Sequence, residues 1–276
     1  MPPDSVYHPK RVAVLAGIEG TLYVGSFVGL YAAWYKDYNS GHFHYFNDND
    51  EWLQVDKVGH ATTSYFLGKI GYDMLRWAGV DEQKSLIFGG GLGFIYQSTV
   101  EVFDGFSRGW GFSWGDMAAN AFGTALFIGQ QAGWHEQRLS LKFSSHFTGY
   151  AQYRPELLGS TPLERIIKDY NGQTYWLSAN VHSFLPESSR FPKWINVAFG
   201  YGAEGMLGGF ANPDEPGVPT FDRYRQYYLS LDIDLTRIPA KRQWVRTLLN
   251  VISFIKVPFP ALEFSKNGVD FHPLYF

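Results

Sequence analysis

The sequence contains no cysteine. This absence excludes disulfides, thiolate metal sites and cysteine nucleophiles, and it leaves no residue to carry the lipid of a lipoprotein anchor. A His-x-x-x-His metal pair is also absent. The glycine run at residues 89–93 is not a phosphate loop, because no Gly-Lys-Ser or Gly-Lys-Thr follows it, and it indicates close helix packing instead.

The chain has little net charge, −3 over 276 residues, so no overall field draws it to nucleic acid and we expect no nucleic-acid partner. What it has in abundance is aromatic side chains, at 18 % of residues. Tyr and Trp combine an apolar body with a polar tip, which suits a lipid–water boundary or a wide β surface. An aromatic-rich core would give the same composition.

Hydrophobic periodicity divides the chain into a helical domain, residues 1–137, and a β-rich region, residues 138–276, and so predicts an α+β fold. The first domain is expected to be an apolar four-helix bundle with helices at Arg11–Tyr35, Trp52–Trp77, Glu82–Phe103 (capped by Asp81) and Ser113–Trp134, separated after the first helix by a loop at Lys36–Glu51. Its contact points are expected at Gly93, Ala119 and Gly123, where small residues let backbones approach.

The first helix is long enough to cross a hydrocarbon layer. The second and third carry several charges, namely Lys57, Lys69, Asp73, Arg76 and Glu101. These charges are too many for simple membrane spans, so a membrane-embedded bundle and a water-soluble bundle both stay open.

The β-rich region is expected to form an antiparallel sheet or an incomplete barrel, with strands at Leu139–Phe143, Tyr175–Phe184, Trp194–Tyr201, Gln226–Leu235, Leu262–Phe264 and Val269–Phe271. Within Gln226–Leu235, apolar and polar residues alternate, which predicts a half-buried or half-lipid-facing strand. Asn267-Gly268 predicts a hairpin turn. Helical insertions are expected at Pro162–Asp169, capped by Thr161, and at Arg242–Ile255.

Polar residues repeat at helical spacing within the apolar helices. Pairs four residues apart share a helix face, and they are Asp56 with His60, Gln97 with Glu101, and Asp116 with Asn120. Glu19 stands alone in the first helix. Because a buried unpaired polar group costs on the order of 1–3 kcal/mol, we expect these stripes to converge in one interior cluster. Lys57 or Arg108 would neutralise its carboxylates.

The order of these residues resembles a known family. Asp56-Lys57-Val58-Gly59-His60, then Gln97 and Glu101 before a glycine-rich turn with Arg108, then the run from Ser113 through Asp116 and Asn120 to Gly123, resembles the YfiM-like predicted periplasmic lipoproteins of unknown function. The same order is similar to the wider VanZ-like membrane proteins, although there the Glu of the third helix usually comes first. The β half resembles the extension of Bacteroidetes-type envelope members. The resemblance implies a location in the envelope of a Gram-negative bacterium, in the outer membrane or periplasm.

Three functions remain open. The cluster of Asp56, His60, Glu101, Asp116 and Asn120 can organise the helical bundle of an uncharacterised envelope protein. In a metal-dependent envelope hydrolase or lipid-modifying enzyme, the same Asp56, His60, Glu101 and Asp116 would be catalytic residues or ligands of a divalent metal, and Arg108 would receive a phosphate. In an outer-membrane scaffold, an aromatic β surface would hold lipid, glycan or an envelope protein.

Overall fold

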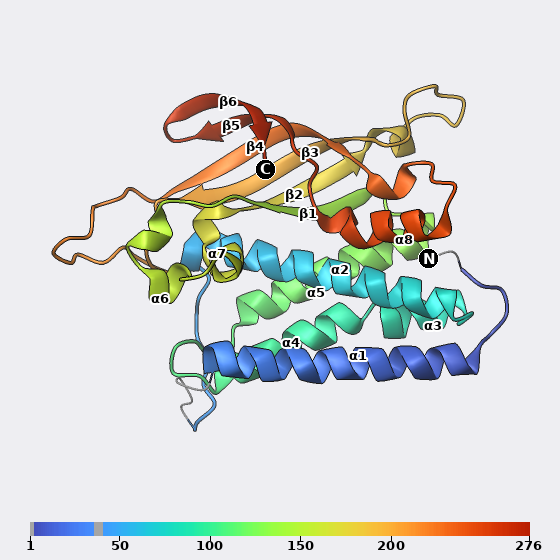
Figure 1. Cartoon of the computed structure of the whole chain (residues 1–276), viewed down its shortest axis with the longest axis horizontal. Helices are drawn as coiled ribbons and strands as arrows, with labels where there is room; N and C mark the ends of the chain where they lie inside the picture. Colours follow the sequence, from blue (N-terminus) through green and yellow to red (C-terminus); the bar gives the residue numbers. More distant parts are fainter. Residues whose placement is uncertain (1–2, 36–40) are drawn as a thin grey trace. The chain divides into compact units, whose positions relative to one another are not determined.

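The computed structural model describes residues 3–35 and 41–276, so the first part of the loop expected at Lys36–Glu51, residues 36–40, lies outside the described residues. The fold is α+β, as the sequence predicts (Figure 1). Two compact units are distinguished: a helical unit of Met1–Asn49 and Thr63–Gln137, and a β unit of Asp50–Thr62 and Arg138–Phe276.

The long helices occur where the apolar periodicity predicts them. Helix α1 spans Pro9–Leu30 and continues as a π-helical turn, Tyr31–Tyr35. Helix α2 spans Val55–Trp77 and follows a 3-10 turn, Glu51–Gln54, in which Trp52 and Leu53 have positive φ. Helix α5 spans Trp114–Trp134 with Ser113 as its N-cap.

The prediction of a single helix at Glu82–Phe103 is wrong in one respect, because the observed helix is interrupted. Its N-cap is confirmed, since the Asp81 side chain accepts from the Lys84 backbone N–H, but α3 covers only Glu82–Lys84. A π-helical turn, Ser85–Gly89, follows, and α4 runs over Leu92–Gly105. The interruption coincides with the glycine run at 89–91, where three consecutive residues of low helix propensity occur.

Glycines bring α2 against the α3–α4 segment inside the helical unit. A Cβ on Gly93 would lie 2.0 Å from the Ser64 carbonyl oxygen, and one on Gly71 would lie 2.7 Å from the Gly89 oxygen. Real Cβ atoms do not approach backbone this closely, so only glycine fits. Gly93 is therefore confirmed as a contact point.

The β unit contains a six-stranded antiparallel sheet in the order β1-β2-β3-β4-β5-β6. The strands are β1 (Leu139–Ser145), β2 (Gln173–Asn180), β3 (Ile195–Glu204), β4 (Tyr224–Ile233), β5 (Phe259–Ser265) and β6 (Gly268–Tyr275). The hairpin at Asn267-Gly268 is confirmed, with Gly268 at φ +127. The strand expected to reach Phe184 ends at Asn180, because the Asn180 side chain accepts from the Ser183 backbone N–H and starts a 3-10 turn, Val181–Phe184.

Short helices interrupt the strands. Helix α6 covers Pro155–Leu158, and α7 covers Pro162–Lys168 with the predicted Thr161 cap, which forms a capping box with Glu164. Helix α8 covers Gln243–Val251 and is followed by a 3-10 turn, Ile252–Phe254, where a longer helix to Ile255 was expected.

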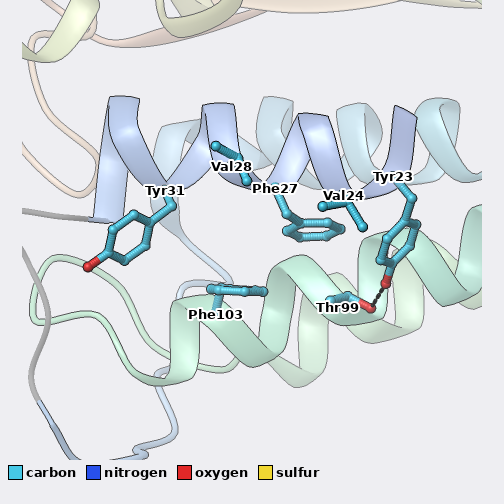
Figure 2. Close-up of a pocket in the computed structure, with 7 residues that line it drawn as sticks. All are labelled: Tyr23, Val24, Phe27, Val28, Tyr31, Thr99 and Phe103. Carbon is cyan, nitrogen blue, oxygen red and sulfur yellow. Dashed lines mark hydrogen bonds between the residues drawn. The ribbon is translucent and has the colours of Figure 1, made fainter. Parts of the chain in front are cut away.

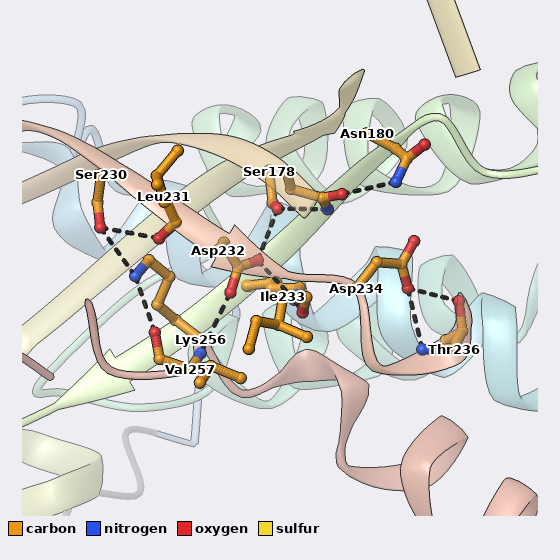
Figure 3. A network of polar contacts seen from close by, with 12 residues as sticks. Ser178, Asn180, Ser230, Leu231, Asp232, Ile233, Asp234, Thr236, Lys256 and Val257 are labelled. Carbon is orange, nitrogen blue, oxygen red and sulfur yellow. Dashed lines mark hydrogen bonds and ion pairs between the residues drawn. The ribbon is translucent and has the colours of Figure 1, made fainter. Parts of the chain in front are cut away.

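The apolar side of the sheet is its exposed side. The residues Leu177, Phe199, Leu229, Leu262 and Phe271 pair in register across five strands, and each is 38–62 % exposed. On the opposite face, Lys142, Trp176 and Asp232 are buried. Buried Ser, Asn, Asp and Lys side chains there form one hydrogen-bonded network (Figure 3). This arrangement is the reverse of the usual one-sided antiparallel sheet, in which the apolar face packs on the core and the polar face contacts water.

Candidate functional site

A buried acidic network surrounds the N-terminus of α5 in the helical unit. Ser113 starts this helix in the usual way, because its Oγ accepts from the Asp116 backbone N–H at 3.1 Å. The same hydroxyl donates to Oδ1 of Asp48 at 2.5 Å, and the Ser113 backbone N–H donates to Oε2 of Glu101 at 3.0 Å. Glu101 is 1 % exposed and Asp116 3 %. Two of the predicted acids thus lie around one cap, where helix N–H groups favour negative charge.

The amide residues extend this network along the helices. Asn120, one turn beyond Asp116, is fully buried, and its Oδ1 accepts from the Ser64 hydroxyl of α2 at 3.3 Å. Gln97, one turn before Glu101 on α4, is also buried. The predicted polar stripes of α4 and α5 therefore both point into the helical unit, where they meet the Ser64 end of the α2 stripe.

The Asp56–His60 pair belongs to the β unit, at the first turns of α2. The Nε2 of His60 lies 3.9 Å from Oδ1 of Asp56, as their four-residue spacing predicts. The same carboxylate oxygen accepts from the Tyr170 hydroxyl at 2.6 Å. Tyr170, Asp56 and His60 thus form a chain that holds the carboxylate beside the imidazole.

Tyr175 of β2 lies beside this chain. A Cβ on Gly59 would be 2.7 Å from the Tyr175 hydroxyl, so glycine is what allows the ring to pack against α2. Burial raises the pKa of Tyr175, and the neighbouring charge of Asp56 raises the pKa further. Tyr175 therefore stays protonated and donates to the Gln173 side chain at 2.8 Å.

The remaining candidates are spread along the chain. Glu19 lies on α1, and its buried Oε1 has no hydrogen-bond partner among the residues that the structure describes. Lys57 is half-buried on α2. Arg108 is exposed, and within residues 3–35 and 41–276 it forms no ion pair with a carboxylate.

Sequence reasoning missed Asp48 and Tyr170 as members of these networks. Asp48 stands in a loop dense in turn formers, and Tyr170 is 114 residues away from Asp56, so no helical spacing connects either residue to its partner.

Sequence reasoning also took a serine-nucleophile motif to be absent, although the sequence contains it twice. Residues 105–109 and 111–115 both read Gly-x-Ser-x-Gly, a pattern that can mark an exposed nucleophile between a strand and a helix. Here Ser107 and Ser113 are each 1 % exposed. Ser107 accepts from the Gly109 backbone N–H in a turn, and Ser113 caps α5. Both serines therefore have structural roles in this conformation.

The two sets of candidates differ in what they can do. The α5 network joins carboxylates to a hydroxyl and to backbone N–H groups, which is an arrangement that fixes helix position. The Tyr170–Asp56–His60 chain resembles the way a carboxylate orients a general base or a metal-binding imidazole. The expected metal ligands are divided between the units, with Asp56 and His60 in the β unit and Glu101 and Asp116 in the helical unit.

Comparison with curated proteins and with solved structures gives no match. A family model does match residues 43–129, which include Asp56, His60, Glu101, Asp116 and Asn120. The similarity to YfiM-like and VanZ-like proteins stays a prediction. What the match supports is a location in the cell envelope or periplasm, since the family that residues 43–129 resemble is described as a predicted periplasmic lipoprotein (DUF2279).

Proposed function

We propose that this chain is a membrane-associated envelope protein whose helical unit is a four-helix bundle in lipid, organised by its buried polar network. The exposed surface of α1 carries the proposal. Val14, Leu22 and Val28 are 59–67 % exposed, on a helix whose only charge beyond Arg11 is Glu19. Such a surface is costly in water, at roughly 25 cal/mol per Å² of apolar area, and costs little in hydrocarbon.

Length supports the same assignment. Two helical segments, Pro9–Leu30 and Glu82–Gly105, are long and apolar enough to cross a membrane. The 22 residues of α1 span about 33 Å at 1.5 Å each, close to the roughly 30 Å of a bilayer core. On the second segment, Ile87, Phe88 and Ile95 are exposed apolar residues.

The surface between α1 and α4 fits an acyl chain. A groove of about 370 Å³ is lined by Val24, Phe27, Val28 and Phe103, with Tyr23 and Thr99 at one end (Figure 2). The two hydroxyls at that end are joined to each other, because Tyr23 and Thr99 are hydrogen-bonded at 2.5 Å. The groove therefore presents mainly apolar surface, with the exposed Tyr31 at its other end (Figure 2).

In this proposal the buried network positions helices within the bundle. A surface that faces lipid gives little drive for helix association, so close glycine contacts and interhelical hydrogen bonds must supply it. The Gly93–Ser64 approach and the Ser64–Asn120 hydrogen bond are contacts of these two kinds.

The absence of cysteine makes a direct test practical. A nitroxide on Leu22→Cys in protein reconstituted into vesicles should be accessible to oxygen and protected from a water-soluble nickel chelate. The matched control is Glu187→Cys, on an exposed loop, which should show the opposite accessibility. Equal nickel accessibility at the two positions would refute the proposal.

A second candidate is a metal-dependent envelope hydrolase or lipid-modifying enzyme centred on His60. The Tyr170–Asp56–His60 chain favours it, because a carboxylate beside an imidazole sets its orientation. Elemental analysis of the purified parent, His60→Ala and Asp56→Asn tests this candidate, with His135→Ala at an exposed position as control. Metal that is lost from the first two variants without unfolding would support it, and a parent that never holds metal would count against it.

A third candidate is an outer-membrane scaffold that holds lipid, glycan or another envelope protein on the sheet. The exposed ladder from Leu177 to Phe271 favours lipid, because apolar-out alternation is typical of lipid-facing strands. A nitroxide on Leu229→Cys, examined in the same vesicles, distinguishes a lipid-facing sheet from a water-facing one.

A further inference from the structure

We propose that α8 docks on the surface of an anionic lipid bilayer as an amphipathic anchor of the β unit. The proposal rests on the membrane association proposed above and adds a second contact, with a different lipid chemistry. Three observations support it: an exposed apolar stripe, a set of exposed basic residues, and a partly buried face followed by a hydrogen-bonded anchor at Lys256.

The apolar stripe follows helical spacing. Trp244, Leu248 and Val251 recur at intervals of four and three residues, and they are 62 %, 48 % and 51 % exposed. Ile255, four residues further on and just after the helix, is also exposed. Trp244, Leu248 and Val251 therefore share one face of α8. A tryptophan on it is suited to the headgroup boundary.

The basic residues around α8 favour anionic lipid. The chain has a net charge of −3, but no acidic residue occurs between Asp234 and Glu263, a segment that contains five basic residues, namely Arg237, Lys241, Arg242, Arg246 and Lys256. Lys241 and Arg242 are exposed at the start of the helix, and the exposed Arg246 lies on the side of α8 away from the stripe. A basic polar face opposite an apolar face is the pattern of helices that lie in the plane of an anionic interface.

The other face of α8 is partly buried. Val245, Leu249 and Ile252 are also spaced by four and three residues, and all three are partly buried. Just beyond them, the Lys256 backbone N–H donates to the Phe143 carbonyl at β1, and its Nζ is buried against Ser230. Because α8 is already helical and the chain just after it is held at Lys256, its exposed stripe is formed and needs no folding step on binding.

The apolar stripe and the basic residues together favour a lipid bilayer as the binding partner of α8. Apolar side chains alone would serve a protein partner or a second copy equally well. The exposed Lys241, Arg242 and Arg246 would repel the same segment of a second copy, and they complement phosphate headgroups.

The experiment uses the full chain with an environment-sensitive fluorophore on Leu248→Cys. The protein is added to vesicles of phosphatidylcholine alone, or of phosphatidylcholine with phosphatidylglycerol. The control label is on Leu163→Cys of α7, which is also highly exposed. We expect a blue shift at residue 248 that requires phosphatidylglycerol and decreases with added salt, and no such shift at residue 163.

Charge reversal provides the second arm. Arg242→Glu with Arg246→Glu should weaken docking of the labelled helix by about tenfold or more, at about 1 kcal/mol for each basic residue at the interface. Lys193→Glu, an exposed reversal elsewhere in the β unit, should leave docking unchanged.

The outcomes separate this inference from the proposed function. A water-exposed probe at residue 248 in anionic vesicles, with residue 22 in lipid, overturns the α8 inference alone. Water exposure at both positions overturns both. A blue shift that depends on protein concentration rather than anionic lipid indicates a second copy and also overturns the inference.

Discussion

Lys142 and Asp232 form a buried ion pair inside the sheet, with Nζ and Oδ2 separated by 2.6 Å and both side chains at most 2 % exposed. Asp232 also accepts from the Ser178 hydroxyl at 2.7 Å and from the Val257 backbone N–H at 3.2 Å (Figure 3). Lys142 donates in addition to the Ile233 carbonyl. The charges are thus held by hydrogen bonds as well as by each other, as buried ions require.

Removal of one partner of this pair should be costly. We expect Lys142→Met to destabilise the protein by about 3–5 kcal/mol, because Asp232 would be left buried without its ion-pair partner. The control is Lys266→Met, whose ion pair with Asp222 at 3.0 Å is exposed and should be worth about 1 kcal/mol or less. Chemical unfolding in detergent micelles measures both values, and equal losses would contradict the buried pair.

Lys256 should make stability depend on pH. Burial lowers its pKa to about 8 from 10.5, and the neighbouring Lys142 acts in the same direction while Asp232 opposes it. Between those two pKa values the unfolded chain binds more protons than the folded one, so this residue makes the folded state more stable as pH rises.

The measurement is the difference in melting temperature between the parent and Lys256→Met. The melting temperature of the parent should rise relative to that of the variant from pH 8 to pH 10. Tyrosine ionisation affects both proteins alike and so cancels in the difference. A constant difference over this range would show that the Lys256 pKa is not lowered.

The Ser113 cap should be important for the helical unit. Ser113→Ala removes both the acceptor for the Asp116 N–H and the donor to Asp48. We expect a loss of about 1–3 kcal/mol, because a cap is removed and a buried carboxylate loses a hydrogen bond. Ser188→Ala, at an exposed loop position, is the control and should unfold like the parent. Hydrolytic activity that disappears in a stable, folded Ser113→Ala protein would instead indicate a nucleophile.

Two glycines in the helical unit should respond in opposite ways to alanine. Gly93→Ala would place a methyl group 2.0 Å from the Ser64 oxygen and should separate α4 from α2, with a large loss of stability. Gly129→Ala on α5 meets nothing within 4 Å and should be neutral or gain up to about 1 kcal/mol from helix propensity. Thermal unfolding of the two variants side by side tests this contrast.

Much of the secondary structure follows from local signals. Asp81, Ser113 and Thr161 each precede a helix and each accept from a backbone N–H at its start, because capping is a contact over three residues. Alternation likewise predicts β4, and Asn267-Gly268 predicts the turn before β6. The interruption after Lys84 was missed, since a glycine run that permits close packing also weakens the helix that contains it.

Helical spacing predicted some contacts of the candidate site and not others. It brings His60 to within 3.9 Å of Asp56, because four residues make about one turn. It could not predict that Asp48 accepts from Ser113 or that Tyr170 reaches Asp56, because those partners come from loops distant in sequence.

The sequence by itself determined the periods, and with them the helices, the strands and the residues that share each face. Tertiary structure alone decided which face of a strand is buried: period two separates Leu229 and Leu231 from Ser230 and Asp232 equally well in either orientation. Here the polar side is buried, because Lys142, Lys256, Ser178 and Asn196 arrive from other segments to satisfy it. Those hydrogen bonds form only when the segments meet, so alternation within one strand cannot reveal them.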